Sequence, residues 1–165
     1  MSVRRLALDL GTTSGWAFWD GQTLLSGYWD LSVRRDESRD FRLIRFRAKL
    51  REFDNVEELY FEAAGMTRFK AAAQVAGQLE GVMFLWAVDR DIPYRSVKPT
   101  ELKKFATLTG KASKPKMILA AKELTGYAGN EDNEADARLV LAWSIHMFGT
   151  LDEIKNWRER RPVLV

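Results

Sequence analysis

Cysteine is absent from this chain of 165 residues, histidine occurs once and proline only four times. The lack of cysteine excludes disulfides and thiolate metal sites, and it fits a reducing compartment such as the cytoplasm. No apolar run approaches ~18 residues, the length of a transmembrane helix, and the first residues lack the anatomy of a signal peptide. We therefore expect one folded domain in residues 1–150, followed by a polar C-terminal tail in residues 151–165.

The net charge is only +3, but the charges are distributed unevenly. Residues 98–116 hold six lysines against one acid, and residues 34–51 hold eight basic side chains among three acids. One compact acidic cluster follows, formed by Glu131, Asp132, Glu134 and Asp136. A basic surface around a small acidic centre indicates a polyanion bound outside and a cation held inside.

Three strands joined by tight turns open the chain, at residues 3–9, 15–19 and 24–31, with a hairpin signal at Asp20-Gly21. Apolar residues then recur at helical spacing over residues 36–53. A strand at 57–62 and a helix at 68–88 follow. The sequence after residue 88 predicts a strand at 93–97 and helices at 99–107, 115–124 and 133–147. This order predicts an α/β fold with a five-stranded mixed sheet, an antiparallel meander of three strands plus two parallel strands, and helices on both faces.

Two carboxylates each close an apolar strand. Asp9 is followed by Gly11 and Gly15, which leave room for a backbone or ligand beside it. An aspartate there can simply cap a turn, but an ionisable residue at the end of a buried strand also suits a metal or phosphate site. Glu62 ends the fourth strand in the same way. If the two strands are parallel neighbours, both acids emerge at the same edge of the sheet.

The last helix supplies further carboxylates. Asp132 and Asp136 are four residues apart and so share one helix face. Acids at a helix N-terminus often act only as caps, which is the alternative for Glu131, Asp132 and Glu134. Asp136 lies between two alanines that allow close packing on the sheet. Carboxylates from separate elements form an oxygen-only site that suits Mg²⁺, or Mn²⁺ in its place, and a pair of such ions fits phosphodiester hydrolysis.

Five short motifs follow one another along nearly the whole chain. They are LDLGTTSGWA at 8–17, FE at 61–62, GQLEG at 77–81, SVK with LTGKASK at 96–98 and 108–114, and DNEADA at 132–137. In this order they resemble the motifs of the RuvC-type Holliday junction resolvases, especially the phage-borne branch. These enzymes belong to the RNase H-like (retroviral integrase) superfamily.

The resemblance implies an RNase H-like fold and a homodimeric, magnesium-dependent endonuclease. Such an enzyme binds branched DNA, in particular four-way junctions, and nicks two strands symmetrically. Its location would be cytoplasmic, in the host cell if a phage encodes the chain. Relatives often carry an acid or histidine where this chain has Asn133, so we expect Asp132 to supply that charge, with Glu134 as the fallback. The implied catalytic and metal-binding set is Asp9, Glu62, Asp132 and Asp136.

Contacts to DNA are expected from the lysine-rich segment, although a solvated helix face is the alternative. Relatives also carry an aromatic residue after the second acid that stacks at the junction centre. Met66 or Phe69 would take that place, or would pack in the core or in a dimer interface. The expected DNA-binding residues are Lys98, Lys103, Lys104, Lys111, Lys114, Lys116, Arg68, Met66 and Phe69.

The helix at 68–88 is richer in apolar residues than one sheet face requires. Its apolar residues include Val75, Leu79, Val82, Met83 and Trp86, and we expect part of the helix to form a two-fold dimer interface. Two other functions stay open. One is a non-catalytic branched-DNA-binding protein on the same fold, suggested by Asn133. The other is a broader nuclease acting on flaps, replication forks or RNA–DNA hybrids.

Overall fold

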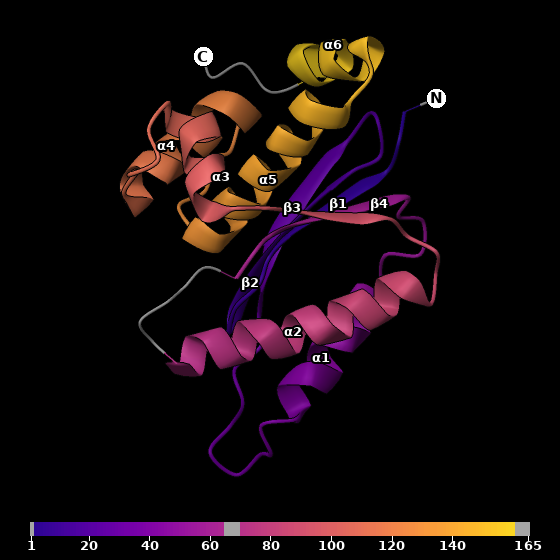
Figure 1. The fold of residues 1–165 in the computed structure, drawn as a ribbon, viewed down its shortest axis with the longest axis vertical. Helices are drawn as coiled ribbons and strands as arrows, with labels where there is room; N and C mark the ends of the chain where they lie inside the picture. Colours follow the sequence, from indigo (N-terminus) through magenta and orange to yellow (C-terminus); the bar gives the residue numbers. More distant parts are fainter. Residues whose placement is uncertain (1, 65–69, 161–165) are drawn as a thin grey trace.

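A five-stranded sheet separates two helical layers in the computed structural model, which describes residues 2–64 and 70–160 (Figure 1). The strand order is β3-β2-β1-β4-β5. β1 and β2 pair antiparallel, as do β2 and β3, whereas β4 pairs parallel with both β1 and β5. The predicted meander with two parallel strands is confirmed. The strands are β1 (Arg5–Asp9), β2 (Thr13–Trp19), β3 (Leu24–Asp30), β4 (Glu58–Glu62) and β5 (Tyr94–Val97).

The two faces of the sheet are covered by different helices (Figure 1). Alternation along β1 sends Leu6 and Leu8 to one face and Ala7 to the other, and all three are fully buried. Leu6 and Leu8 belong to the core under α1 (Phe41–Leu50) and α2 (Lys70–Val88). Ala7 belongs to the core under α5 (Asp132–Phe148), which also contains residues of α3 (Pro99–Thr107), α4 (Lys114–Thr125) and α6 (Leu151–Arg160). Helices on both faces were expected and are present.

Helix α1 is shorter than the 36–53 span that the periodicity predicted. It begins at Phe41, because the preceding residues form turns held by side chains. The Glu37 carboxylate accepts from the backbone N–H of Arg34 at 2.8 Å and pairs with Arg45 at 2.6 Å. These bonds satisfy the segment without helical hydrogen bonds.

The expected polar tail contains a helix, α6, that packs on the body of the protein. Trp157 is 8% exposed and meets Trp19 of β2 edge-on, with ring centroids 5.2 Å apart. Glu153 is buried, accepts from the backbone N–H of Val3 at 2.9 Å and pairs with Arg5 at 2.9 Å. Its other carboxylate oxygen accepts from the N–H of Thr150 at 2.8 Å. The division of the chain at residue 150 stays a prediction.

Helix α2 differs from the other described helices in its hydropathy. Of the helices in residues 2–64 and 70–160, it alone is long and apolar enough to cross a membrane by length and composition. However, Leu79, Met83 and Trp86 are buried in the core against the sheet and α1. The packing therefore explains one face of α2, and its opposite face lies on the surface.

Candidate active site

Asp9 and Glu62 lie side by side at one edge of the sheet. The parallel register of β1 and β4 pairs Leu8 with Phe61, the residues just before the two acids. Each acid is the last residue of its strand. Side chains alternate along a strand, which puts Asp9 on the face of Ala7 and Glu62 on the face of Tyr60. That is the face covered by α5. Both predicted acids therefore meet beneath the last long helix.

Asp136 joins them from the second turn of α5, and a glycine determines how closely this helix approaches. Gly15 pairs with Asp9 across β1 and β2. A Cβ at Gly15 would collide with the backbone carbonyl of Asn133 at the start of α5. One close backbone contact thus fixes the start of the helix relative to Asp9.

The three carboxyl groups hold protons more strongly than isolated acids. Burial raises the pKa of Asp9 well above its ordinary value, and the charges of Glu62 and Asp136 raise it further. Burial, followed by repulsion from Asp136, raises the pKa of Glu62 to about 7. Burial, followed by the charge of Asp132, raises the pKa of Asp136 to about 6. Like charges gathered in a poorly solvated site produce this pattern, and a bound cation would relieve it.

Asp132 extends the group toward solvent and is paired with a lysine. Lys114, at the start of α4, donates a hydrogen bond to the Asp132 carboxylate, which lowers the pKa of Asp132 and raises that of the lysine. The charge of Lys103 offsets part of the rise in the pKa values of Glu62 and Asp136. Two expected DNA-binding lysines therefore lie at the carboxylates.

Glu134, the fallback ligand, is occupied elsewhere. Its carboxylate accepts from the hydroxyl of Ser26 at 2.6 Å, and the Tyr127 hydroxyl lies 3.4 Å away. Arg138, which is 8% exposed, donates to the same serine at 2.7 Å. Glu134 thus belongs to a polar network that joins α5 to β3. Sequence reasoning missed Tyr127, because no motif or spacing marks it.

The N-terminal turn of α5 contains one further acid and Asn133. The Glu131 carboxylate caps the helix by accepting from the N–H of Glu134 at 2.6 Å and also accepts from the Asn133 side chain at 2.7 Å. The capping alternative therefore applies to Glu131. Asn133 serves this cap through its side chain and faces Gly15 through its backbone.

The donor set fits a hard divalent cation in its chemistry. Asp136 Oδ1 is buried and has no hydrogen-bond partner among the described residues. An orphaned carboxylate oxygen of this kind suits a metal ligand. Across residues 2–64 and 70–160, no three acidic or histidine side chains lie close enough together to coordinate one metal ion as they stand. The carboxylates are neighbours, and a shared ion would have to draw them together.

The chain is similar in sequence to a known nuclease. It is 32% identical over 112 residues to the crossover junction endodeoxyribonuclease RuvC of Pseudothermotoga lettingae. The match covers 61% of this chain and 66% of that relative, slightly less than two thirds of its length. No family model matches the chain.

Solved structures share the fold. RuvC of Thermus thermophilus superposes with a TM-score of 0.72 at 20% identity, over 88% of this chain and 96% of that one. T. thermophilus RuvC in complex with a Holliday junction substrate superposes with a TM-score of 0.70 at 19% identity, over 85% of this chain and 91% of that one. The chain therefore has the fold of these RuvC structures. A yeast mitochondrial Holliday junction resolvase also matches, with a TM-score of 0.58 at 14% identity over 97% of this chain and 84% of that one.

The lysines expected to bind DNA lie on the α3–α4 side of this RuvC-type fold. Lys98 precedes α3, and Lys111 lies in the loop between the two helices. All except the half-buried Lys103 are exposed. Arg68, Met66 and Phe69 lie outside the described residues, so the expectation of a wedge at the junction centre stays a prediction. The expected lysines are Lys98, Lys103, Lys104, Lys111, Lys114 and Lys116.

The exposed face of α2 carries other residues than the apolar ones that the sequence analysis named. Of the expected residues, Leu79, Met83 and Trp86 are buried in the core of their own chain. The exposed face instead carries Leu85 and Val88, 63% and 60% exposed, and two glycines with open space above them. This face, called the α2 surface below, consists of Gly77, Gly81, Leu85 and Val88.

Proposed function

We propose that the chain is a divalent-metal-dependent endonuclease that cuts four-way DNA junctions by paired symmetric nicks. The observation that carries the proposal is the meeting of Asp9, Glu62 and Asp136 at one edge of the sheet, beside the lysines of α3 and α4. The similarity in sequence to RuvC supports the choice of substrate, because the matched relative is a crossover junction endodeoxyribonuclease.

Asp9, Glu62 and Asp136, together with Asp132, would hold Mg²⁺ or Mn²⁺, with two ions as the expected number. Such ions generate a nucleophile from water and stabilise the leaving oxygen of a phosphodiester. Lys114 neutralises Asp132 in the protein alone. With a cation on that carboxylate, the ammonium group of Lys114 would be free to bind a DNA phosphate.

Paired nicks require two active sites related by symmetry, so we propose a homodimer formed through the α2 surface. Gly77 and Gly81 are four residues apart on this surface, and the absence of their side chains permits two helices to approach closely. Leu85 and Val88 would supply apolar contact area beside them. An isologous interface presents two identical catalytic edges to two strands of one junction.

The test is cleavage of an end-labelled four-way junction, beside a linear duplex and a flap, with Mg²⁺ or with EDTA. We expect symmetric nicks in the junction with Mg²⁺ only. Asp9→Asn should reduce cleavage to background and retain junction binding. Binding without cleavage by the unaltered protein would favour an architectural role, and equal cutting of the flap would indicate a general debranching nuclease.

Two further variants separate the neighbouring acids of α5. Asp132→Asn should reduce cleavage, because it removes a metal ligand. Glu134→Gln is the matched control, since glutamine can still accept the hydrogen bond from Ser26. If Glu134→Gln lost cleavage while Asp132→Asn retained it, the assignment of the fourth carboxylate would be reversed.

A further inference from the structure

A hollow of about 370 Å³, lined by polar side chains and by small apolar ones such as Val33 and Val75, lies at the catalytic edge on the α1–α2 side of the sheet. Thr12, three residues beyond Asp9, lines it together with Arg39 and Arg42 from the start of α1 and Gln74 and Gln78 of α2. Its polar lining is cationic or neutral, without a carboxylate. A hollow with two guanidinium groups, two amides and a hydroxyl suits a phosphate diester.

Two hydrogen bonds tether this hollow to the loop that follows Asp9. The N–H of Leu31 donates to the carbonyl of Thr12 at 2.8 Å. The carbonyl of Leu31 accepts from Arg42 Nε at 3.1 Å. Arg42 is therefore held in a defined position relative to the end of β1, while its two terminal nitrogens remain available to a ligand.

The arginines of this segment are not equivalent. Arg45 is already used, because it pairs with Glu37 and donates to the carbonyl of Ser32. Arg39 and Arg42 have no carboxylate within ion-pair distance in the part of the chain that the structure describes. Two guanidinium groups left without a counter-ion beside a catalytic edge are free to bind an anion.

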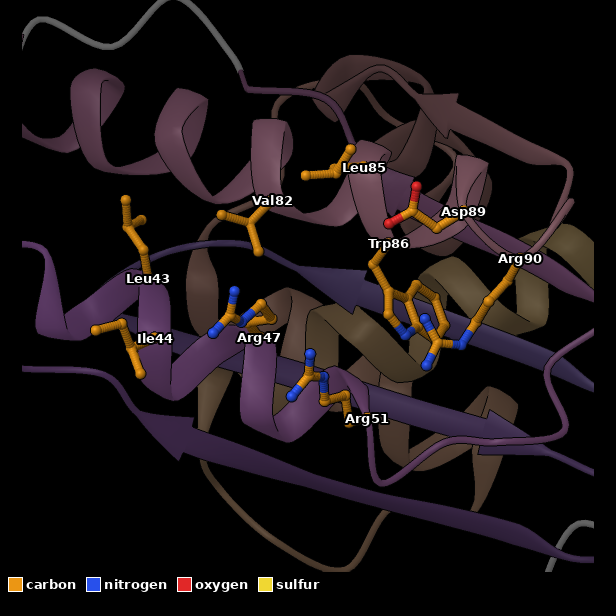
Figure 2. Close-up of a pocket in the computed structure, with 9 residues that line it drawn as sticks. All are labelled: Leu43, Ile44, Arg47, Arg51, Val82, Leu85, Trp86, Asp89 and Arg90. Atoms are coloured by element: carbon orange, nitrogen blue, oxygen red, sulfur yellow. The ribbon is translucent and has the colours of Figure 1, made fainter.

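A second hollow provides a contrast at the other end of the same helix pair. Figure 2 shows Arg47, Arg51 and Arg90 around it, with Trp86 and an apolar half that includes Leu85. It contains a carboxylate, Asp89, and none of its lining residues belongs to the candidate active site. Arg42 lies in the first turn of α1 and Arg51 follows its last residue, so the two arginines are separated by about 13 Å along the helix axis.

We propose that Arg39 and Arg42, with Gln74 and Gln78, bind neighbouring backbone phosphates of a second junction arm. The lysines of α3 and α4 lie on the opposite side of the sheet (Figure 1). A straight duplex can follow one side, whereas a DNA that contacts both sides must turn around the catalytic edge. A branched DNA does so without being bent. The hollow therefore contributes to the preference for junctions over linear duplex, an inference that rests on the proposed function.

Binding is measured in the Asp9→Asn background, without cleavage, for a four-way junction and a linear duplex over a range of salt concentrations. Each phosphate contact contributes about 0.9 to the slope of log K against log salt. Arg39→Ala with Arg42→Ala should reduce the junction slope by about 2 and weaken junction binding by roughly one to two orders of magnitude at 0.1 M salt. Duplex binding should change much less.

Arg51→Ala with Arg90→Ala is the matched control, because it removes the same charge from the hollow of Figure 2. This pair should leave the ratio of junction to duplex affinity unchanged. Arg39→Ala alone, at an exposed position without side-chain hydrogen bonds among the described residues, should lower the junction slope by about 1 even if loss of Arg42 weakens folding.

The inference is overturned if the Arg39/Arg42 variant keeps the junction slope, if it weakens duplex and junction equally, or if the control pair has the same effect. Failure of the proposed function gives a different result. In that case the Asp9→Asn reference itself shows no preference for the junction over the duplex.

Discussion

Asp9, Glu62 and Asp136 make the protein less stable when no metal is bound. Their pKa values are raised, so the folded state holds protons that the unfolded state releases. The contribution of these three acids to stability is therefore greatest below their unfolded pKa values, near pH 4, and is lost as the pH rises toward about 7. For Glu62 alone, a rise from 4.5 to about 7 corresponds to about 3 kcal/mol.

We expect the melting temperature in EDTA to fall by roughly 10 °C between pH 5 and pH 8, and Mg²⁺ to restore much of that loss at pH 8. Asp9→Asn should raise the melting temperature in EDTA at pH 8, although it removes cleavage. Calorimetry of both proteins at the two pH values measures this. A melting temperature in EDTA that is independent of pH, or lower in Asp9→Asn, would contradict the prediction.

At the residue scale, the sequence indicated the central acids because a charge that ends an apolar strand is conspicuous. It favoured Asp132 over Glu134 but could not show which groups each of them contacts. The difference lies in partners far along the chain: Lys114 for Asp132, and Ser26 and Tyr127 for Glu134. Contacts of this kind follow from the fold and not from local spacing.

Among the elements, α5 depends on Gly15 for its distance from β1. Gly15→Ala would place a Cβ against the Asn133 carbonyl and push the start of the helix away from Asp9. We expect a loss of roughly 1–3 kcal/mol in stability and a larger loss of cleavage, with an increased Mg²⁺ requirement. Metal titrations of cleavage measure this. An alanine variant with unchanged Mg²⁺ dependence would show that this contact does not position the carboxylates.

Helix α6 is attached to β1 and β4 by a buried ion group. Arg5, 1% exposed, lies between Glu58 and Glu153, with both ion pairs at 2.9 Å. Burial opposes ionisation of Glu153, but hydrogen bonds from Thr150 and Val3 and the charge of Arg5 lower its pKa overall. The stabilisation is thus present above the ordinary glutamate pKa and is lost as the pH falls through the lowered value.

Glu153→Ala should destabilise the protein by about 3 kcal/mol, because it leaves Arg5 buried with one partner fewer. Urea unfolding monitored by tryptophan fluorescence reports the change, since Trp157 packs in the same helix. Replacing the whole group, as Arg5→Met with Glu58→Gln and Glu153→Leu, should recover much of the stability. A triple variant less stable than the single one would show that the ion group is favourable in itself.

Strand order was predictable because short turns and apolar runs are local signals. Helix α6 was not, because its burial depends on a few residues separated by charges. Ile154 and Trp157 supply its apolar contacts, while Glu153 docks through an arginine nearly 150 residues earlier in the chain. The start of α1 was misplaced for a related reason, since Glu37 binds the backbone of its own turn.

For the whole molecule, the proposed dimer through the α2 surface would let two catalytic edges act on one junction. Leu85→Glu should convert the dimer to a monomer and replace paired nicks by single, uncoordinated ones, because a charge would be buried at an apolar interface. Leu25→Glu on β3 is the matched control at a leucine 53% exposed. Sedimentation and cruciform-plasmid cleavage measure the two effects. A dimer that persists in Leu85→Glu would exclude this interface.

The hydrophobic content of α2 led to the prediction of a dimer helix, but it could not indicate which face is free. The core beneath the sheet takes Leu79, Met83 and Trp86, and only the packing reveals this. The remaining stripe is almost uncharged between Ala71 and Val88.

The contacts of Glu153 with Ser2, Val3 and Arg5 join the beginning of the described chain to its last helix. They do so at the end of β1 opposite Asp9, about 13 Å away along the strand. A fluorophore or affinity handle attached near either end of the described chain would therefore sit behind the catalytic edge. Labelled protein could then report on junction binding without obstructing the DNA.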